Sequence, residues 1–461
     1  MIASGSNSEQ DLETIAGSAV EAAVGAGAGD AEAFVQDSTG LQVRVFDQRV
    51  ESLTEAGERG LGVRVWVDGR AGYAYGTDLG DRGIGEIAAG AVEAARVADP
   101  DEFAAAPEAI GEPERIEGLA DPEAANWKTE RKVELAIATE RAAREADGRV
   151  AAVETTVFVD ERAAVALASS RGASGAYEAT YCYAFLSAIA EEGDDRQTGL
   201  GFGMGRSPAA LDPEGIGREA AERSTALLGA AKPASRTCPV VLDETVAASF
   251  AGFIGGVLCA DAVQRGRSPF AGRLGEAVGS SALTLADDGA DPAGLNSGPF
   301  DGEGTPSGRT TLIERGELSA YLHDSYTARR EGGDVRSTAN AARSGYRSPP
   351  SVSTSNLIVA TGELGFDELL AEAGDGMYVT DVAGLHSGVN PVSGTFSVGA
   401  TGRAISGGEL AEPADEFTIA SDLPSMLAAV RATGSEARWV PFGGSVATPA
   451  LLIGEMAIGG A

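Results

Sequence analysis

Basic residues are scarce in this chain. Its 461 residues include 35 lysines and arginines against 69 aspartates and glutamates, which leaves a formal net charge of −34. Nucleic acids and anionic membranes both bind proteins through a basic surface, so neither is expected as a partner. The arginine-rich, acidic composition fits either a GC-rich genome or a salty cytoplasm and does not decide between them.

Cysteines and long apolar runs are also sparse. The three cysteines, Cys182, Cys238 and Cys259, are odd in number and lack C-x-x-C spacing. This argues against a disulfide framework and a structural zinc site, and we expect all three to be reduced and buried. There is no apolar run of membrane-spanning length and no signal-like N-terminal segment. We therefore expect a soluble, cytoplasmic protein.

The chain has only two histidines, His323 and His386, which limits histidine-dependent catalysis. A Ser-His-Asp triad would need one of them as its base, and no G-x-S-x-G elbow is present. The two histidines are not an i, i+4 pair on a helix. A two-histidine metal site completed by Asp324 remains open on geometry. We interpret His323, at the end of a predicted strand, as a structural or cleft-lining residue.

Glycine, by contrast, is abundant at 63 residues, which suits tight turns and barrel-like sheets. The length predicts two or three domains, which we place at 1–112, 113–232 and 233–461. The sequence of helix, sheet and helix occurs in each of the first two, and Asp68-Gly69 predicts a hairpin turn. The N-terminal half is thus expected to form two related α/β layers joined by an acidic, proline-rich linker.

After residue 237 the chain becomes rich in strands and turns, which predicts a closed or nearly closed sheet. Within it, Asp243 is a candidate N-cap for a helix that is apolar on every side and therefore buried. The predicted fold class is α+β, with N-terminal α/β layers followed by a β-rich, barrel-like domain around a buried helix. The glycine-rich segment 199–205 lacks the context of a dinucleotide loop and is predicted to be a strand approached closely by other backbone.

The buried helix and the RGRSPF sequence after it resemble the third region of the TldD/PmbA (TldE) family of peptidase-like proteins. The resemblance covers most of the chain, and its further signatures occur in order at fitting spacing. They lie at residues 43–52, 60–65, 72–78, 325–329, 388–399, 444–446 and 455–460.

In the catalytic TldD branch this helix carries His-Glu-x-x-x-His, which binds a metal. The corresponding positions here are Ala251, Gly252 and Gly256, and no cysteine follows Cys259 to act as the C-terminal ligand of that branch. The resemblance therefore implies the PmbA/TldE-like branch, without catalytic residues, metal ligands or a cofactor in this chain. A metal, expected to be zinc, would be held by the partner subunit.

The resemblance also implies that loop 387–399 faces a substrate cleft. The loop offers an amide and hydroxyl groups without a base, which suits the binding of an extended peptide backbone. Arginine and tyrosine side chains nearby are candidate anchors for a chain carboxylate. The expected substrate-binding residues are Asn390, Ser393, Thr395, His386, His323, Tyr326, Arg329 and Arg265.

We therefore expect a non-catalytic subunit that pairs with a TldD-like metalloprotease subunit and shapes the cleft for unfolded or modified peptides. Two alternatives stay open. The pair could hydrolyse a small natural product, or the chain could be a binding or scaffold protein that acts as a homodimer. A large dimer interface is expected in either case.

Overall fold

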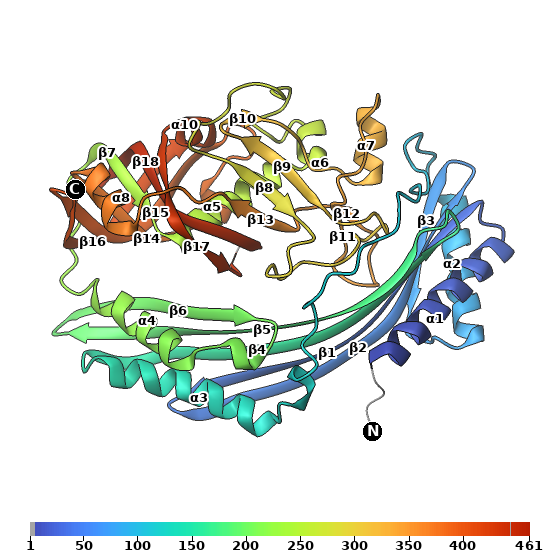
Figure 1. Cartoon of the computed structure of the whole chain (residues 1–461), viewed down its shortest axis with the longest axis horizontal. Coiled ribbons are helices and arrows are strands. Elements are labelled where there is room, and N and C mark those ends of the chain that lie inside the picture. Colours follow the sequence, from blue (N-terminus) through green and yellow to red (C-terminus); the bar gives the residue numbers. More distant parts are fainter. Residues whose placement is uncertain (1–4, 443) are drawn as a thin grey trace.

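The computed structural model of the chain describes residues 5–442 and 444–461, which form a long curved sheet with a β-rich body on its concave side (Figure 1). Helices cover the convex side of the sheet. The α+β class and the β-rich C-terminal half are as predicted. Because the sheet and the body come from different halves of the sequence, their junction depends on long-range contacts.

The curved sheet is antiparallel and has the strand order β3-β2-β1-β4-β5-β6. β1 pairs with β4 over nearly its whole length, from Glu32 opposite Ser169 to Val45 opposite Thr156. The two layers expected from the sequence are therefore fused into one sheet. Its strands are β1 (Asp30–Phe46), β2 (Arg49–Val67), β3 (Arg70–Gly76), β4 (Val150–Ser169), β5 (Ser174–Glu192) and β6 (Asp195–Gly205).

The turn between β2 and β3 confirms the hairpin prediction. Asp68 and Gly69 have φ of 47° and 72°, the positive values that a two-residue type I′ turn requires at both central positions. The bend feeds β3 back along β2 with Val67 opposite Arg70.

Two pairs of helices cover the convex face of the sheet (Figure 1). Their inward faces carry many alanines and glycines, so helix and sheet approach closely. A Cβ on Gly201 would lie 2.1 Å from the Ile216 carbonyl oxygen, which confirms the close backbone approach predicted for segment 199–205. The helices are α1 (Gly5–Gly25), α2 (Asp81–Val97), α3 (Thr129–Ala146) and α4 (Pro213–Thr225), with short turns η1 (Ala124–Asn126) and η2 (Pro208–Ala210).

The C-terminal body is built on a ten-stranded sheet in which β18 pairs with β7 as well as with β16, so that β7, β14, β15, β16 and β18 form a closed ring. This closure agrees with the expected barrel-like arrangement. The strands are β7 (Arg236–Leu242), β8 (Leu285–Asp288), β9 (Arg309–Glu314), β10 (Glu317–Leu318), β13 (Asn356–Val359), β14 (Gly376–Ala383), β15 (Thr395–Ser406), β16 (Glu409–Asp422), β17 (Val430–Val440) and β18 (Ser445–Gly459), beside the small pair β11 (Ala341–Ala342) and β12 (Ser351–Val352).

The predicted buried helix is α5 (Glu244–Val257), which packs against β18 and β14 and belongs to the largest apolar core of the protein. Shorter helices follow it. They are α6 (Ala260–Gln264), α7 (Ser325–Glu331), α8 (Phe366–Ala373), α9 (Leu385–Gly388) and α10 (Leu423–Ala428). Among the described residues, no helix is long and apolar enough to cross a membrane.

A buried cluster of charges joins the sheet to the body. Glu32 on β1 is fully buried and accepts hydrogen bonds from Arg64, at 2.9 Å, and from Arg343. Arg64 also pairs with the buried Glu303 at 2.9 Å. Glu303 in turn accepts from the backbone N–H of Ser325 at 2.9 Å. Buried charges are tolerated only when they are paired, so this cluster fixes how the body sits on the concave face.

Candidate functional site

Helix α5 is the centre of the candidate site. The buried Asp243 caps it, with Oδ1 accepting from the N–H groups of Thr245 at 2.7 Å and Val246 at 3.4 Å. The cap satisfies N–H groups that have no partner within the helix, as the sequence predicted. Burial on the body side leaves a narrow accessible strip along the helix, on which Gly256 is exposed.

The side chains on α5 do not fit a metal site. Ala251 is 4% exposed and packs in the core, and Gly252 and Gly256 offer no donor atom. A Cβ at Gly256 would meet no atom of the described residues within 4 Å, so this face of the helix borders open space. In the part of the chain that the structure describes, no three His, Cys, Asp or Glu side chains are grouped to hold a metal ion.

Cys259, just beyond the end of α5, is buried, and burial raises the pKa of its thiol to about 12. The thiol therefore stays protonated at neutral pH and is neither a thiolate nucleophile nor a ready metal ligand. Cys182 and Cys238 are buried and reduced as well, so the sequence prediction for all three cysteines is confirmed.

His323 is buried at 5% exposure at the N-terminal end of α7. Its backbone N–H donates to Thr338 Oγ1 at 2.7 Å, whereas its ring Nδ1 has no hydrogen-bond partner among the residues that the structure describes. Burial lowers the pKa of the imidazole and outweighs the nearby carboxylates of Glu331 and Asp324, so the ring is neutral at pH 7. The backbone of His323 is thus held by hydrogen bonds within the fold, and its ring is buried beside the body core.

Tyr326 and Arg329 of α7 are occupied by contacts within the chain. The Tyr326 hydroxyl donates to Asp101 at 2.9 Å. The Arg329 guanidinium donates to the carbonyl oxygens of Phe103 at 2.8 Å and Ala105 at 2.7 Å. These hydrogen bonds attach the linker after α2 to the C-terminal body. The two side chains serve as substrate anchors only if the linker releases them.

Loop 387–399 is held by its own polar groups. Asn390 Oδ1 accepts from the N–H groups of Val392 at 2.9 Å and Ser393 at 3.3 Å, the pattern of an asparagine-stabilised turn. The hydroxyls of Ser393 and Thr395 are 2.8 Å apart and bonded to each other. The three residues are exposed, so the Asn390 amide NH₂ group and the hydroxyl lone pairs face solvent. The His386 side chain lies outside the described residues.

The fold brings this loop next to α5. The ring of Phe396, within the loop, packs against that of Phe250 on α5, with ring centroids 5.0 Å apart. Gly394 lies against Pro269 in the turn after α6, since a Cβ there would be 3.2 Å from the proline ring. Arg265 begins that turn and pairs with Asp261 at 2.7 Å while remaining largely exposed. Loop, turn and helix therefore form one neighbourhood, whereas Tyr326 and Arg329 are engaged elsewhere.

A network of charged side chains near the start of α5 was not predicted from the sequence. Arg223 on α4 donates to Asp243 at 2.7 Å and to Glu219 at 3.1 Å. Arg438 on β17 also donates to Glu219, at 2.8 Å, and lies over the ring of Phe202. No motif marks these residues, because they come from three distant segments. They connect the helix layer to the capping residue of α5.

Models of three consecutive domains of one family match the chain: PmbA/TldA metallopeptidase domain 1 at residues 31–95, the central domain at 122–228 and the C-terminal domain at 235–460. The chain belongs to this family of metallopeptidase-like proteins, which confirms the resemblance inferred from the motifs.

Among individual relatives, the chain is 29% identical to the metalloprotease PmbA of Escherichia coli O157:H7, over 97% of this chain and 96% of that protein. It is 27% identical to a metalloprotease TldD homologue of Haemophilus influenzae, over 87% of each. A crystal structure of a proposed modulator of a DNA gyrase from Thermotoga maritima superposes with a TM-score of 0.88 at 26% identity, covering 97% of this chain and 99% of that one. TldE from Thermococcus kodakarensis shares the fold, with a TM-score of 0.87 at 23% identity over 96% of this chain and 99% of that one.

Proposed function

We propose that this chain is a TldE-like subunit that works with a TldD-like metalloprotease subunit in the cytoplasm. The observation that carries the proposal is the composition of α5, where Ala251, Gly252 and Gly256 occupy the positions of a metal-binding motif. None of them can ligate a metal or move a proton. The metal, the activated water and the base would come from the partner.

In this proposal the chain's own contribution is to bind and orient substrate. The exposed amide and hydroxyl groups of Asn390, Ser393 and Thr395 suit hydrogen bonding to an extended peptide backbone. The open space beside Gly256 leaves room for a peptide to run along α5. A glycine at this position lets a substrate chain approach the helix backbone closely. Unfolded or modified peptides are the substrate class that this open, polar surface favours.

The test is to purify the chain alone, the TldD-like protein encoded by the same genome alone, and the two together. We expect peptide cleavage by the mixture only, with metal bound to the partner. Mass measurement of the mixture should give a heterodimer. A chain that cleaves peptides alone, or that binds one metal tightly per molecule, would overturn the proposal. Cleavage by the partner at an unchanged rate without this chain would overturn it as well.

The Gly256→Trp variant of this chain, combined with the TldD-like protein, tests the substrate path along α5. Its side chain would enter the open space beside α5, and we expect it to block turnover while the pair still assembles. The same assays should include a small peptide-like natural product as the second substrate class. A self-association of the chain that excludes the TldD-like protein would favour the scaffold homodimer instead.

A further inference from the structure

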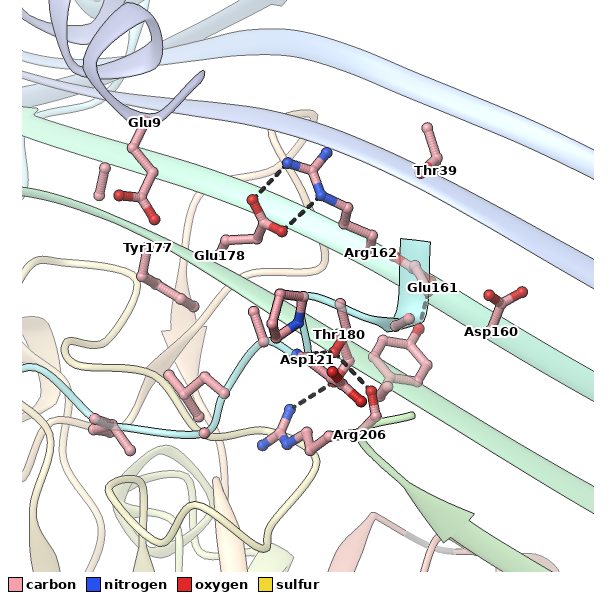
Figure 2. Close-up of a pocket in the computed structure, with 18 of the residues that line it drawn as sticks. Glu9, Thr39, Asp121, Asp160, Glu161, Arg162, Tyr177, Glu178, Thr180 and Arg206 are labelled. Carbon is pink, nitrogen blue, oxygen red and sulfur yellow. Dashed lines mark hydrogen bonds and ion pairs between the residues drawn. The ribbon is translucent and has the colours of Figure 1, made fainter. Parts of the chain in front are cut away.

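A cavity of about 1500 Å³ lies away from α5, between the two helix pairs on the convex face, and continues around the edge of β5. Its floor is polar, with Thr39, Arg162 and Glu178 on three neighbouring strands (Figure 2). Residues 113–122, the later part of the linker between α2 and α3, cross over it. A sheet face under helices is normally apolar, so a wide polar gap here calls for an explanation.

The charge of the cavity is negative. Eight acidic and four basic side chains line it, and most of the basic groups already form ion pairs or hydrogen bonds within the protein. The Arg162 guanidinium donates two hydrogen bonds to the Glu178 carboxylate, at 2.7 and 2.5 Å. Lys132 forms an ion pair with Asp160 at 2.5 Å. The acidic residues are Glu9, Glu13, Glu55, Glu117, Asp121, Asp160, Glu161 and Glu178, and the basic ones are Arg115, Lys132, Arg162 and Arg206.

The pKa of Glu9 reflects the negative charge of its surroundings. Burial raises the pKa of its carboxyl group, and the neighbouring Glu178 raises it further. Both carboxylates lie beside the same stretch of β5 in Figure 2. A positively charged group placed between them would relieve the repulsion.

The same cavity contains an unpaired strand edge. Pairing of β5 with β6 begins at Cys182 opposite Gly205, so within residues 5–442 and 444–461 no strand pairs with residues 174–181 of β5 on that side. The Thr180 N–H donates outward to the Leu119 carbonyl at 2.9 Å, and its carbonyl accepts from Arg206 at 3.2 Å. Backbone groups that point the same way recur every second residue, so those of Ala176 and Glu178 also point outward. In the part of the chain that the structure describes, they have no hydrogen-bond partner.

We propose that this edge and cavity bind an extended basic peptide segment, which adds as a strand alongside residues 174–178 of β5. The unpaired backbone groups would bond the peptide backbone, and the carboxylates of Glu9 and Glu13 would attract its lysine or arginine side chains. This site lies apart from the α5 neighbourhood and does not depend on the function proposed above.

The two faces of β5 define the sequence that would fit. Glu178 faces the helices and Glu9, whereas Tyr177 faces the other way and packs edge-on against Phe300 with ring centroids 5.3 Å apart. An added strand alternates in the same manner. The preferred segment therefore has a basic residue at every second position and an apolar one between.

The test is fluorescence polarisation at low salt with a labelled octapeptide of alternating lysine and valine. A second peptide has the same composition with its lysines in one block. We expect the alternating peptide to bind more tightly and its affinity to fall as salt is added. The double variant Glu9→Gln/Glu13→Gln should weaken binding by roughly three- to tenfold. Glu21→Gln, on the same helix but outside the cavity lining, is the matched control and should change nothing.

Ala176→Pro removes an outward N–H from an edge position where proline is tolerated, and it should weaken the alternating peptide by roughly tenfold. Melting curves of each variant check that it is folded, and the double variant tests the site even if the proline variant is unstable. Equal binding of the two peptides, or no effect of Glu9→Gln/Glu13→Gln, would overturn the proposal. Tight binding of spermine that is unaffected by Ala176→Pro would identify a polyamine site instead.

Discussion

The adjacent glycines at the end of α5 allow a direct test of which side of the helix is open. Replacing glycine by alanine inside a helix stabilises a protein by about 0.5–1 kcal/mol, because the unfolded chain loses freedom. Gly256 is exposed, and a Cβ there meets no atom within 4 Å in the part of the chain that the structure describes. Gly256→Ala should therefore show this gain in full.

Gly255→Ala makes the same chemical change one residue earlier, where the space is filled. Its Cβ would lie 2.6 Å from Leu357 Cδ1 and 2.7 Å from Thr354 Cγ2. Overpacking of a core costs about 1–3 kcal/mol, which offsets or exceeds the helix gain. We expect the two variants to differ by about 1–3 kcal/mol in the free energy of unfolding, with Gly256→Ala the more stable.

Calorimetric melting of the isolated chain measures this difference. For a unit of about the size of the C-terminal body, each kcal/mol shifts the melting temperature by roughly 2–4 °C. Equal stabilisation by both substitutions would show that α5 is loosely packed on the Leu357 side. A destabilised Gly256→Ala protein would show that the space beside this residue is filled, and the substrate path proposed along α5 would fail with it.

Three further outcomes are expected. Because the pKa of His323 is lowered by burial, the unfolded chain binds more protons below pH 6.5, so stability should fall as the pH drops through this region. The melting temperature of the His323→Gln variant should therefore depend less on pH. NMR titration of labelled histidine, with His386→Gln to assign the signals, measures the pKa of His323 directly. An ordinary pKa for His323 would contradict the reasoning. Asn390→Ala should lower the free energy of unfolding by about 0.5–1.5 kcal/mol because two backbone N–H groups lose their acceptor. Asn390→Asp keeps a side-chain oxygen as acceptor and is the control. Unchanged melting of Asn390→Ala with reduced turnover by the pair would instead show that the amide binds substrate. Arg329→Ala should release the linker and speed its cleavage in limited proteolysis, and an unchanged cleavage pattern would show that Phe103 and Ala105 are held by other contacts.

Local patterns were enough to predict several elements of the fold. The apolar run after Asp243 predicted a capped, buried helix, because a helix that is apolar on all sides must be covered. Asp68-Gly69 predicted its turn because few residues accept positive φ at both positions. The absence of donor groups at Ala251, Gly252 and Gly256 was likewise readable from the residue types alone.

The sequence did not predict how the layers are joined or which polar groups remain free. Glu32 lies on a strand that resembles any half-buried strand, yet it is fully buried by arginines 32 and 311 residues away along the chain. Tyr326 and Arg329 suggested substrate anchors from their types and family context, and the fold gives them the linker as a partner. Helical and strand periodicity reports only which face of an element is buried. Which donor meets which acceptor depends on the packing of segments far apart in sequence, and only the tertiary structure decides that.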